Sequence, residues 1–293
     1  MKTFTSELEA KDGQKLYVQG WEPDGAPKGV VALVHGLGEH TGRYPHVGKA
    51  LTDAGYVLAG FDLRGHGRTE GPRGYAPSFQ AIMEDIDALL AFLKQRYSDR
   101  LPLFQYGHSL GGLLTVAHHL YAHPDVAGVL VSAPGFASPL LEQRAKILLI
   151  RVLGSLLPRM VLDTGLDVKT LSHDQKVVDA YVADPLAHEK TSLSFGRAGL
   201  DALDFAFRHA AEFKAPLLIM HGTEDRLTYP RGSQEFIGMV SSKDAQFRPW
   251  EGLYHEIHNE PEQGQVLAAM IAWLDAHAQS KIAEGAGVLP AKS

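Results

Sequence analysis

The chain has 293 residues, of which 45% are hydrophobic and 21% charged, and its formal net charge is -6. This composition is ordinary for a soluble globular protein, and because no basic run stands out we expect no nucleic-acid partner. The sequence contains no cysteine, which excludes disulfides, thiolate catalysis and cysteine metal sites. The N-terminus lacks the apolar core of a secretory signal, and no run of about 18 apolar residues occurs. We therefore expect a cytoplasmic location and no transmembrane helix.

The predicted elements alternate between strands and helices. The N-terminal part predicts a hairpin that turns at Asp12-Gly13. Five short apolar runs, typical of strands buried on both faces, begin at Gly29, Tyr56, Leu101, Val126 and Ala215. Helical patterns cover 44–55, 78–97, 110–123 and 261–279, and Ser78 is the expected N-cap of the second. Together these elements predict an α/β fold with a mostly parallel central sheet flanked by helices.

The alternation breaks between about residues 135 and 210, where the pattern is helical throughout. This stretch lies between two predicted strands, so we interpret it as a helical cap inserted into a core made of 1–134 and 211–293. The last residues, 283–293, are expected to form a flexible tail.

Ser109 lies in a G-x-S-x-G pattern, Gly107 to Gly111, directly after a predicted strand and directly before a predicted helix. A serine on such a turn is either an ordinary structural residue or an exposed nucleophile. Its own pKa is too high for attack without a base, so the rest of the chain must supply partners. His108, beside it, is expected to pack.

His255 is the best candidate base, because it follows the strand-like stretch 245–252 and precedes the last helix. This position is a loop at the carboxyl edge of the sheet, where catalytic groups of α/β folds collect. The orienting carboxylate is expected between serine and base in the sequence, and the loop after 215–220 offers Glu224 and Asp225. We favour Asp225, with Glu224 as a solvated neighbour. His255 with His258 could alternatively be read as metal ligands, but no third ligand has a fitting spacing.

The oxyanion hole needs two backbone N–H donors. The residue after the nucleophile, Leu110, supplies one, and Leu37 in the loop after the first buried strand is expected to supply the other. The alternative for His35-Gly36 in that loop is a tight turn that serves packing only.

These residues carry a family resemblance over nearly the whole chain. The stretches "HGLGEHTGRY", "FDLRGHGRTEGPRG", "GHSLGG", "HGTEDRLTYP" and "YHEIHNE" resemble the α/β-hydrolases of the monoacylglycerol lipase and lysophospholipase group. The cap stretch 171–186 is similar to that group as well, although it has His173 where the family often has arginine.

The resemblance implies that polar residues hold the glycerol hydroxyls of a substrate. By motif position these residues are Glu39, Arg43, Tyr181 and His258. Unpaired polar groups of such a site would penalise a plain alkyl ester. Other interpretations stay open: Glu39 and Arg43 as an ion pair that braces the loop, and Tyr181 as a packing residue of a cap helix.

The cap stretch 146–162 is rich in leucine and isoleucine but is interrupted by Arg151, Pro158 and Arg159. It could lie at a membrane surface in transient peripheral contact, line an acyl tunnel, or simply pack on the core.

We therefore expect a serine hydrolase that cleaves monoacylglycerols, small lipid esters, through an acyl-enzyme and without a cofactor or metal. A lysophospholipase and a broad carboxylesterase are the alternatives among enzymes. Outside enzymes, the alternative is a catalytically silent binding protein with the same fold.

Overall fold

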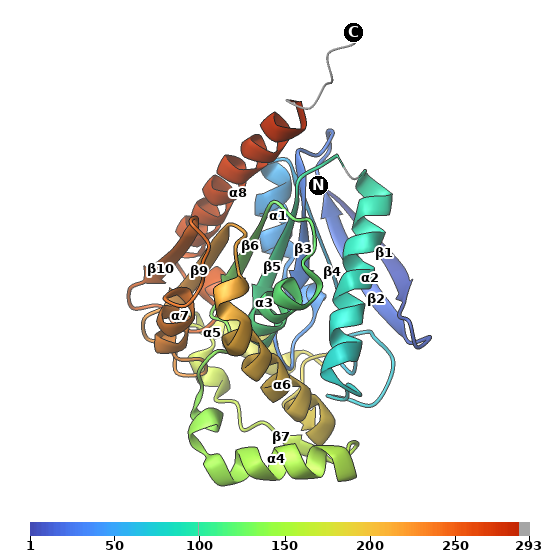
Figure 1. Ribbon diagram of the computed structural model, residues 1–293, viewed down its shortest axis with the longest axis vertical. Coiled ribbons are helices and arrows are strands. Elements are labelled where there is room, and N and C mark those ends of the chain that lie inside the picture. The colour runs from blue at the N-terminus through green and yellow to red at the C-terminus, as the bar shows by residue number, and fades with distance from the viewer. Residues whose placement is uncertain (99, 287–293) are drawn as a thin grey trace.

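The computed structural model describes residues 1–98 and 100–286 (Figure 1). Within that part, eight strands form one sheet in the order β1-β2-β4-β3-β5-β6-β9-β10. The pairs β1–β2 and β2–β4 are antiparallel, and all other neighbours are parallel. The predicted hairpin and the mostly parallel sheet are confirmed. The strands are β1 Lys2–Glu9, β2 Lys15–Glu22, β3 Gly29–Val34, β4 Tyr56–Phe61, β5 Leu103–His108, β6 Gly128–Ser132, β9 Leu217–Gly222 and β10 Ala245–Trp250.

Helices fill both faces of the sheet. They are α1 Pro45–Asp53, α2 Phe79–Tyr97, α3 Leu110–Ala122, α4 Arg144–Leu156, α5 Gln175–Ala183, α6 Leu193–His209, α7 Pro230–Ile237 and α8 Gln263–Ala286. Short 3-10 turns lie at Thr41–Arg43, Pro139–Glu142, Val168–Thr170, Ala210–Glu212 and Ile257–Asn259. The Ser78 hydroxyl accepts the Ala81 N–H at 3.2 Å, which confirms the expected N-cap of α2. The short helix α7 was not predicted from the sequence.

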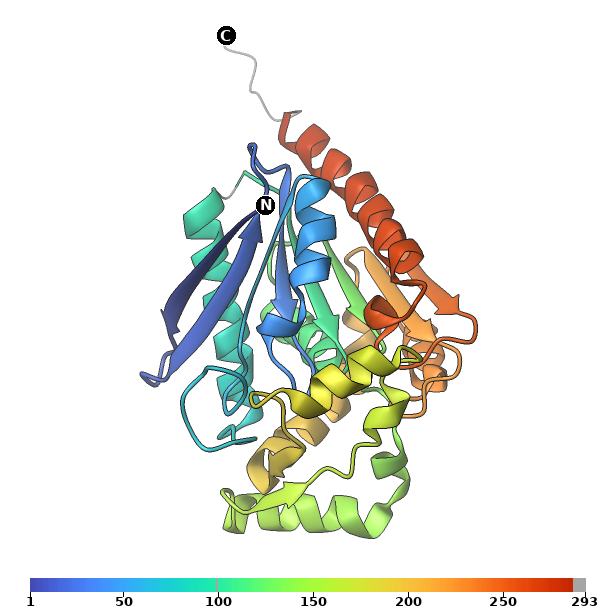
Figure 2. The same ribbon diagram turned by 180° about the vertical axis from the view of Figure 1, so that it is seen from behind.

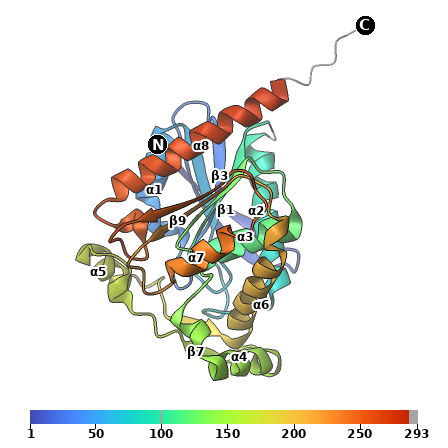
Figure 3. The ribbon, with the colours of Figure 1, turned by 60° about the vertical axis from the view of Figure 1, so that its left-hand side comes forward.

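The two faces of the sheet bury separate hydrophobic clusters. Along β3, Val30 and Val34 belong to one cluster while Val31 and Leu33 belong to the other, because successive side chains of a strand point to opposite faces. The first cluster takes in α2, α3 and α6, and the second takes in α1 and α8. Figure 3 shows α1 and α8 on one side of the sheet and α2, α3 and α7 on the other. Burial on both faces explains why these strands read as continuous apolar runs.

The segment between β6 and β9 lies over one end of the sheet, with α4 outermost (Figures 1 and 2). It is not helical throughout as expected, because β7 Val161–Asp163 and β8 Lys190–Ser192 pair as a small antiparallel sheet. The last cap helix, α6, packs on α3, and its Phe195 and Ala202 join the buried cluster of the core. The insertion at 135–210 therefore contains one helix that belongs to the core packing, and its exact boundaries stay a prediction.

The C-terminal helix α8 continues to Ala286, so residues 283–286 of the expected tail are helical. The remainder of that prediction, 287–293, lies outside the described residues. Among the helices that the structure describes, none combines the length and apolar character needed to cross a membrane.

Candidate active site

Ser109 occupies the turn between β5 and α3 with φ 55° and ψ -122°. This left-handed conformation is costly for a residue with a side chain, and such outliers collect at functional sites. The flanking glycines are required by space. A Cβ on Gly107 would collide with the Gly111 carbonyl, and one on Gly111 would collide with the carbonyls of Val34 and His35. The turn therefore presents the Ser109 side chain at the carboxyl end of the sheet, as the motif predicted.

Ser109, His255 and Asp225 form one hydrogen-bonded chain. The Ser109 Oγ lies 2.9 Å from His255 Nε2, and His255 Nδ1 lies 2.7 Å from Asp225 Oδ2. A carboxylate only accepts hydrogen bonds, so His255 donates from Nδ1, and Nε2 is left to accept the serine proton. The structure thus brings together the three residues that the sequence singled out. Asp225 lies 30 positions before His255, and Ser109 lies 146 positions before it.

Asp225 is held by more than His255. Its Oδ1 accepts the backbone N–H groups of Leu227 and Thr228 at 2.8 and 3.0 Å. Its Oδ2 also accepts from His221 Nε2 at 3.0 Å, and the Thr228 hydroxyl lies 2.9 Å away. His221 in turn contacts the Ser233 hydroxyl through Nδ1 at 2.8 Å. The carboxylate is therefore fixed in position by donors on every side.

These contacts set the protonation of the pair. Burial raises the pKa of Asp225, but the His255 ring and the His221 hydrogen bond lower it more, so this pKa lies well below its usual range. Burial lowers the pKa of His255, but the Asp225 carboxylate raises it more, and the net shift is upward from 6.5. The arrangement suits a base that takes a proton and is stabilised as the imidazolium.

The loop after β3 approaches Ser109 through a glycine. A Cβ at Gly36 would lie 3.1 Å from Ser109 Cβ and 2.9 Å from Glu39 Oε1. The His35 ring fixes the start of this loop, because its Nε2 accepts the Leu63 N–H and its Nδ1 therefore donates to the Gly36 carbonyl, both at 2.8 Å. The turn itself lies at Leu37-Gly38, so His35-Gly36 is the extended start of the loop that approaches the nucleophile rather than a tight turn.

Leu37 and Leu110 both line the cavity beside Ser109. Leu110 is the first residue of α3, so its N–H has no acceptor within the helix. Their roles as the two oxyanion donors stay predictions.

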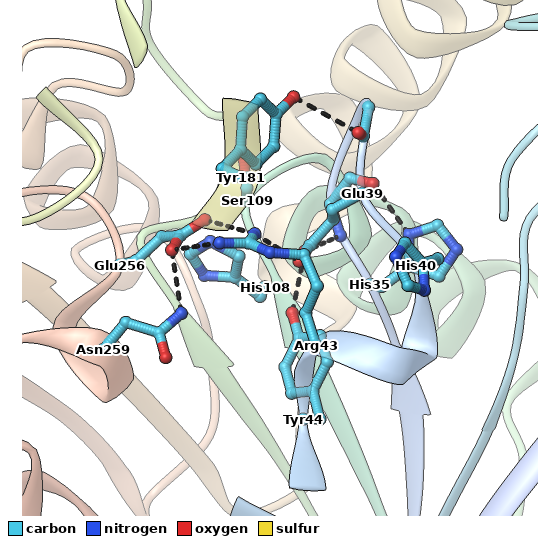
Figure 4. Close-up of polar contacts among 12 residues, drawn as sticks. His35, Glu39, His40, Arg43, Tyr44, His108, Ser109, Tyr181, Glu256 and Asn259 are labelled. Carbon is cyan, nitrogen blue, oxygen red and sulfur yellow. Dashed lines mark hydrogen bonds and ion pairs between the residues drawn. The ribbon is translucent and has the colours of Figure 1, made fainter. Parts of the chain in front are cut away.

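Glu39 and Arg43 belong to a buried ionic network (Figure 4). Glu39 Oε1 accepts the Gly36 N–H at 2.5 Å and the Tyr44 hydroxyl at 2.7 Å. Arg43 donates to Glu39 Oε2 at 3.1 Å and to both oxygens of Glu256 at 2.6 and 2.9 Å. The interpretation of Glu39 and Arg43 as an ion pair that braces the loop is confirmed, with Glu256 as a third member.

Tyr181 joins the cap to this loop. Its hydroxyl donates to the Gly38 carbonyl at 3.2 Å, and its ring lies under the Arg43 guanidinium at 4.9 Å from the ring centroid. The His188 N–H also donates to the Gly38 carbonyl at 2.9 Å. Tyr181 is therefore a packing residue that also faces the cavity.

His258 is buried and lies outside the cavity lining, as does Arg43. The His258 ring stacks on Tyr44 at 5.2 Å and meets His108 edge-on at 4.7 Å between centroids. Substrate contact by Arg43 and His258 therefore stays a prediction. The placement of their side chains outside the lining does not support it. His108 packs, as expected, and its Nδ1 contacts the Ser132 hydroxyl at 3.0 Å.

Both His255 nitrogens are occupied by Ser109 and Asp225 rather than turned toward His258. In the part of the chain that the structure describes, no group of three histidine, aspartate or glutamate residues could hold a metal ion.

His173, the departure from the family pattern, has a structural partner. Its Nδ1 lies 3.1 Å from Glu260 Oε1, and its ring stacks on Tyr254 at 3.6 Å between centroids. The histidine therefore ties the cap to the loop that carries His255.

A cavity of about 330 Å³ opens at Ser109. Its lining is mostly apolar, from Leu110, Leu113, Leu140, Leu141, Ile150, Leu162, Leu166, Leu171, Phe195, Leu200, Leu203 and Leu227. Glu39, Tyr181 and Glu256 supply polar groups to the same cavity. Such a space fits an ester with an acyl chain on one side of the carbonyl and a polar group on the other.

Sequence reasoning missed two residues. His221 lies four positions before Asp225 in "HGTED", so a titratable partner for the acid was visible in the motif. Glu256 directly follows His255, and a carboxylate next to the base was a signal for an electrostatic role.

The fold and this geometry define a serine hydrolase of the α/β class, and comparison with known proteins agrees. The family described as serine aminopeptidase, S33 matches residues 25–262, and the chain belongs to it.

Among similar proteins, the monoacylglycerol lipase of Mycolicibacterium smegmatis is 36% identical, with 90% of this chain and 94% of that protein aligned. Phospholipase YtpA of Bacillus subtilis is 32% identical, over 87% of this chain and 98% of that protein. The crystal structure of Paleococcus ferrophilus monoacylglycerol lipase superimposes with a TM-score of 0.82 at 35% identity, covering 89% of this chain and 99% of that one. A longer, uncharacterised abhydrolase domain-containing protein of Dictyostelium discoideum is 33% identical, and the chain spans 29% of its length.

Proposed function

We propose that this protein hydrolyses monoacylglycerols to fatty acid and glycerol. The observation that carries the proposal is the Ser109–His255–Asp225 hydrogen-bonded chain at a cavity with an apolar body and a group of polar residues. The similarity to proteins named monoacylglycerol lipase supports the same substrate.

In the proposed mechanism, Ser109 Oγ attacks the ester carbonyl while His255 Nε2 takes the serine proton. Asp225 keeps His255 in the tautomer that accepts at Nε2 and stabilises the imidazolium. The backbone N–H groups of Leu37 and Leu110 stabilise the oxyanion. His255 then protonates the leaving glycerol oxygen, and a water activated by His255 releases the fatty acid from Ser109.

The acyl chain would occupy the apolar lining, and the glycerol hydroxyls would meet Glu39 and Tyr181. Arg43 and His258 would act from behind, Arg43 by holding Glu39 and Glu256 and His258 by packing on Tyr44.

Initial rates on matched oleoyl esters test the substrate. We expect 1-monoolein to be cleaved faster than lysophosphatidylcholine or triolein, and Ser109→Ala to abolish all three activities. Faster cleavage of lysophosphatidylcholine would favour the lysophospholipase. Activity confined to short p-nitrophenyl esters would favour the carboxylesterase. Failure of a fluorophosphonate to label Ser109 would favour a catalytically silent binding protein.

We also propose transient membrane contact through α4 and the turn after it. Large apolar side chains are exposed there, among them Leu148, Leu149, Val152 and Leu156, the last at 69%. Within 144–160 the sequence carries four basic residues and no acidic one, although the whole chain is negative. Arg151 pairs with Asp204 of α6, so the charges offered to a surface are those of Arg144, Lys146 and Arg159. An apolar face flanked by positive charge suits an anionic lipid surface. A cytoplasmic location stays a prediction from the sequence.

Co-sedimentation with vesicles of phosphatidylcholine and phosphatidylglycerol tests this contact. Changing Leu148 and Leu156 together to serine should reduce the bound fraction. Met239→Ser, which changes an exposed apolar side chain outside the cap, should leave the bound fraction unchanged. Equal binding by all three proteins would contradict the proposal.

A further inference from the structure

Two carboxylates at the polar end of the cavity hold one guanidinium that lies behind the lining. Arg43 Nη1 donates to Glu39 Oε2 and to Glu256 Oε1, and Nη2 donates to Glu256 Oε2. The side chains of Glu39 and Glu256 are 4% and 2% exposed, and that of Arg43 is 10% exposed. We call Glu39, Arg43 and Glu256 the network; Figure 4 shows it beside Tyr181.

All three ionisable groups of this network are charged at neutral pH. Burial raises the pKa of Glu39, but Arg43 opposes it and the value falls to about 2. Burial likewise raises the pKa of Glu256, and Arg43 lowers it more. The two carboxylates raise the pKa of Arg43 further above its usual range, against the effect of burial. Two negative charges and one positive charge leave the network with a net charge of minus one.

The two negatively charged residues of the network belong to the cavity lining. Glu39 and Glu256 are lining residues, whereas Arg43 is not. The lining also contains one lysine and one aspartate, Lys146 and Asp163. Both belong to the cap, Lys146 to α4 and Asp163 to β7. A substrate head group beside Ser109 would therefore meet carboxylates, with the Arg43 charge already committed to them.

The hydrogen-bonding capacity of the network points to the same kind of ligand. Glu39 accepts three hydrogen bonds, from Gly36, Tyr44 and Arg43. Glu256 also accepts three, two from Arg43 and one from the Asn259 side chain at 2.8 Å. An ionised carboxylate has roughly four acceptor positions, so each retains about one. Free acceptors suit hydroxyl donors and offer nothing to a phosphate, which is itself an acceptor.

We propose that Glu256, together with Glu39, determines head-group specificity by charge: the site admits uncharged hydroxylated head groups and rejects anionic phosphate esters. The inference rests on the proposed function and adds which lipid esters that function excludes. Relatives of the chain are named both monoacylglycerol lipase and phospholipase, so similarity alone does not supply this choice. Specificity of this kind comes from a repulsive element as much as from an attractive one.

The test compares kcat/KM for 1-monoolein and for 1-oleoyl-lysophosphatidic acid in the wild type, in Glu256→Gln and in Glu251→Gln. Glu251 is exposed in the turn after β10, so its change removes the same charge outside the cavity. We expect the wild type to prefer monoolein by about 100-fold or more. Glu256→Gln should narrow this ratio by about tenfold, through KM for the anionic ester, while Glu251→Gln leaves it unchanged.

Equal kcat/KM for both esters in the wild type would overturn the inference without any variant. An unchanged ratio in Glu256→Gln that still cleaves monoolein would also overturn it. No monoolein cleavage by the wild type would instead refute the proposed function.

If Glu256→Gln loses activity, the inference is tested by measuring binding instead of turnover. The affinity of a non-hydrolysable ether analogue of the lysophosphatidic acid is measured for Ser109→Ala and for Ser109→Ala combined with Glu256→Gln. We expect about tenfold tighter binding by the double variant, and no gain in affinity would contradict the inference.

Discussion

At the scale of single residues, the site is a set of buried charges whose partners fix both position and protonation. Asp225 accepts from His255, from His221 and from two backbone N–H groups. Glu39 and Glu256 both accept hydrogen bonds from Arg43, and the charge of each carboxylate also raises the pKa of His255. The protonation of His255 therefore depends on Asp225, which is in direct contact, and on the two carboxylates of Glu39 and Glu256, which act without a hydrogen bond to the ring.

The pH dependence follows from the direction of this shift. Neutral His255 is the proposed base, so activity requires a pH above its pKa. Because that pKa is raised above 6.5, kcat/KM should be fully present at alkaline pH and be lost as pH falls through a value above 6.5. A pH profile of monoolein hydrolysis between about pH 5 and 9 measures it. An acid limb well below pH 6.5 would contradict the assignment.

His221 is predicted to be a positioning residue for Asp225. Removal of its Nε2 donor in His221→Ala should lower kcat about tenfold. It should also move the acid limb to higher pH, because the Asp225 charge then acts more fully on His255. His221→Gln, whose amide N–H can reach the same oxygen, should restore part of both properties. A loss of activity with an unmoved acid limb in both variants would mean that His221 has only a packing role.

At the scale of elements, α5 connects the cap to the loop that approaches the nucleophile. Tyr181 and the His188 N–H both donate to the Gly38 carbonyl, and His40 Nε2 lies 2.8 Å from Asp184 Oδ2 at the end of α5. The base loop is held by the cap as well, because the Glu256 N–H donates to the Leu171 carbonyl at 2.8 Å. The inner part of the cap is therefore part of the site, whereas α4 is the outer, exposed part.

Tyr181→Phe tests this connection. It removes one hydrogen bond to the Gly38 carbonyl, worth about 1 kcal/mol, and should lower kcat/KM for monoolein by up to about tenfold. Val182→Ala changes the next residue of α5, which is exposed, and should leave kcat/KM unchanged. Equal rates for Tyr181→Phe and the wild type would show that the hydroxyl is not needed.

The elements also show how far the sequence alone could lead. The buried strands were recognisable because burial on both faces leaves an apolar run, and the elbow because its glycines are required by space. The pair β7–β8 was missed because two strands of three residues leave no periodic pattern. The position of Glu256 beside His255 was visible in the sequence, but its contact with Arg43, 213 positions away, was not, because no local spacing reveals such a contact.

At the scale of the whole molecule, loops that are distant in the sequence meet at one edge of the sheet, whereas the hydrophobic core lies on the two faces of the sheet. Ser109 follows β5, Asp225 follows β9, and His255 follows β10, so all three lie at the carboxyl ends of parallel strands. The cluster that contains α8 lies on one face of the sheet, away from the cap. Stability and catalysis should therefore respond separately to changes in α8.

Met270→Ala tests this separation. Met270 is 1% exposed in the α8 cluster, and its truncation should lower the free energy of unfolding by about 2–5 kcal/mol. The kcat for monoolein per fluorophosphonate-titrated site should stay at the wild-type value. Gln265→Ala on the exposed side of the same helix should change neither property. A large fall in kcat per titrated site in Met270→Ala would contradict the separation.

The most direct test of the account is a search for the acyl-enzyme. The protein is mixed with 1-monoolein, quenched in acid within the first turnovers, and measured by intact mass with peptide mapping. We predict a single oleoyl group, located on the peptide that carries Ser109 and missing from Ser109→Ala. Monoolein hydrolysis that proceeds with no adduct, or with an adduct on another residue, would contradict Ser109 as the nucleophile.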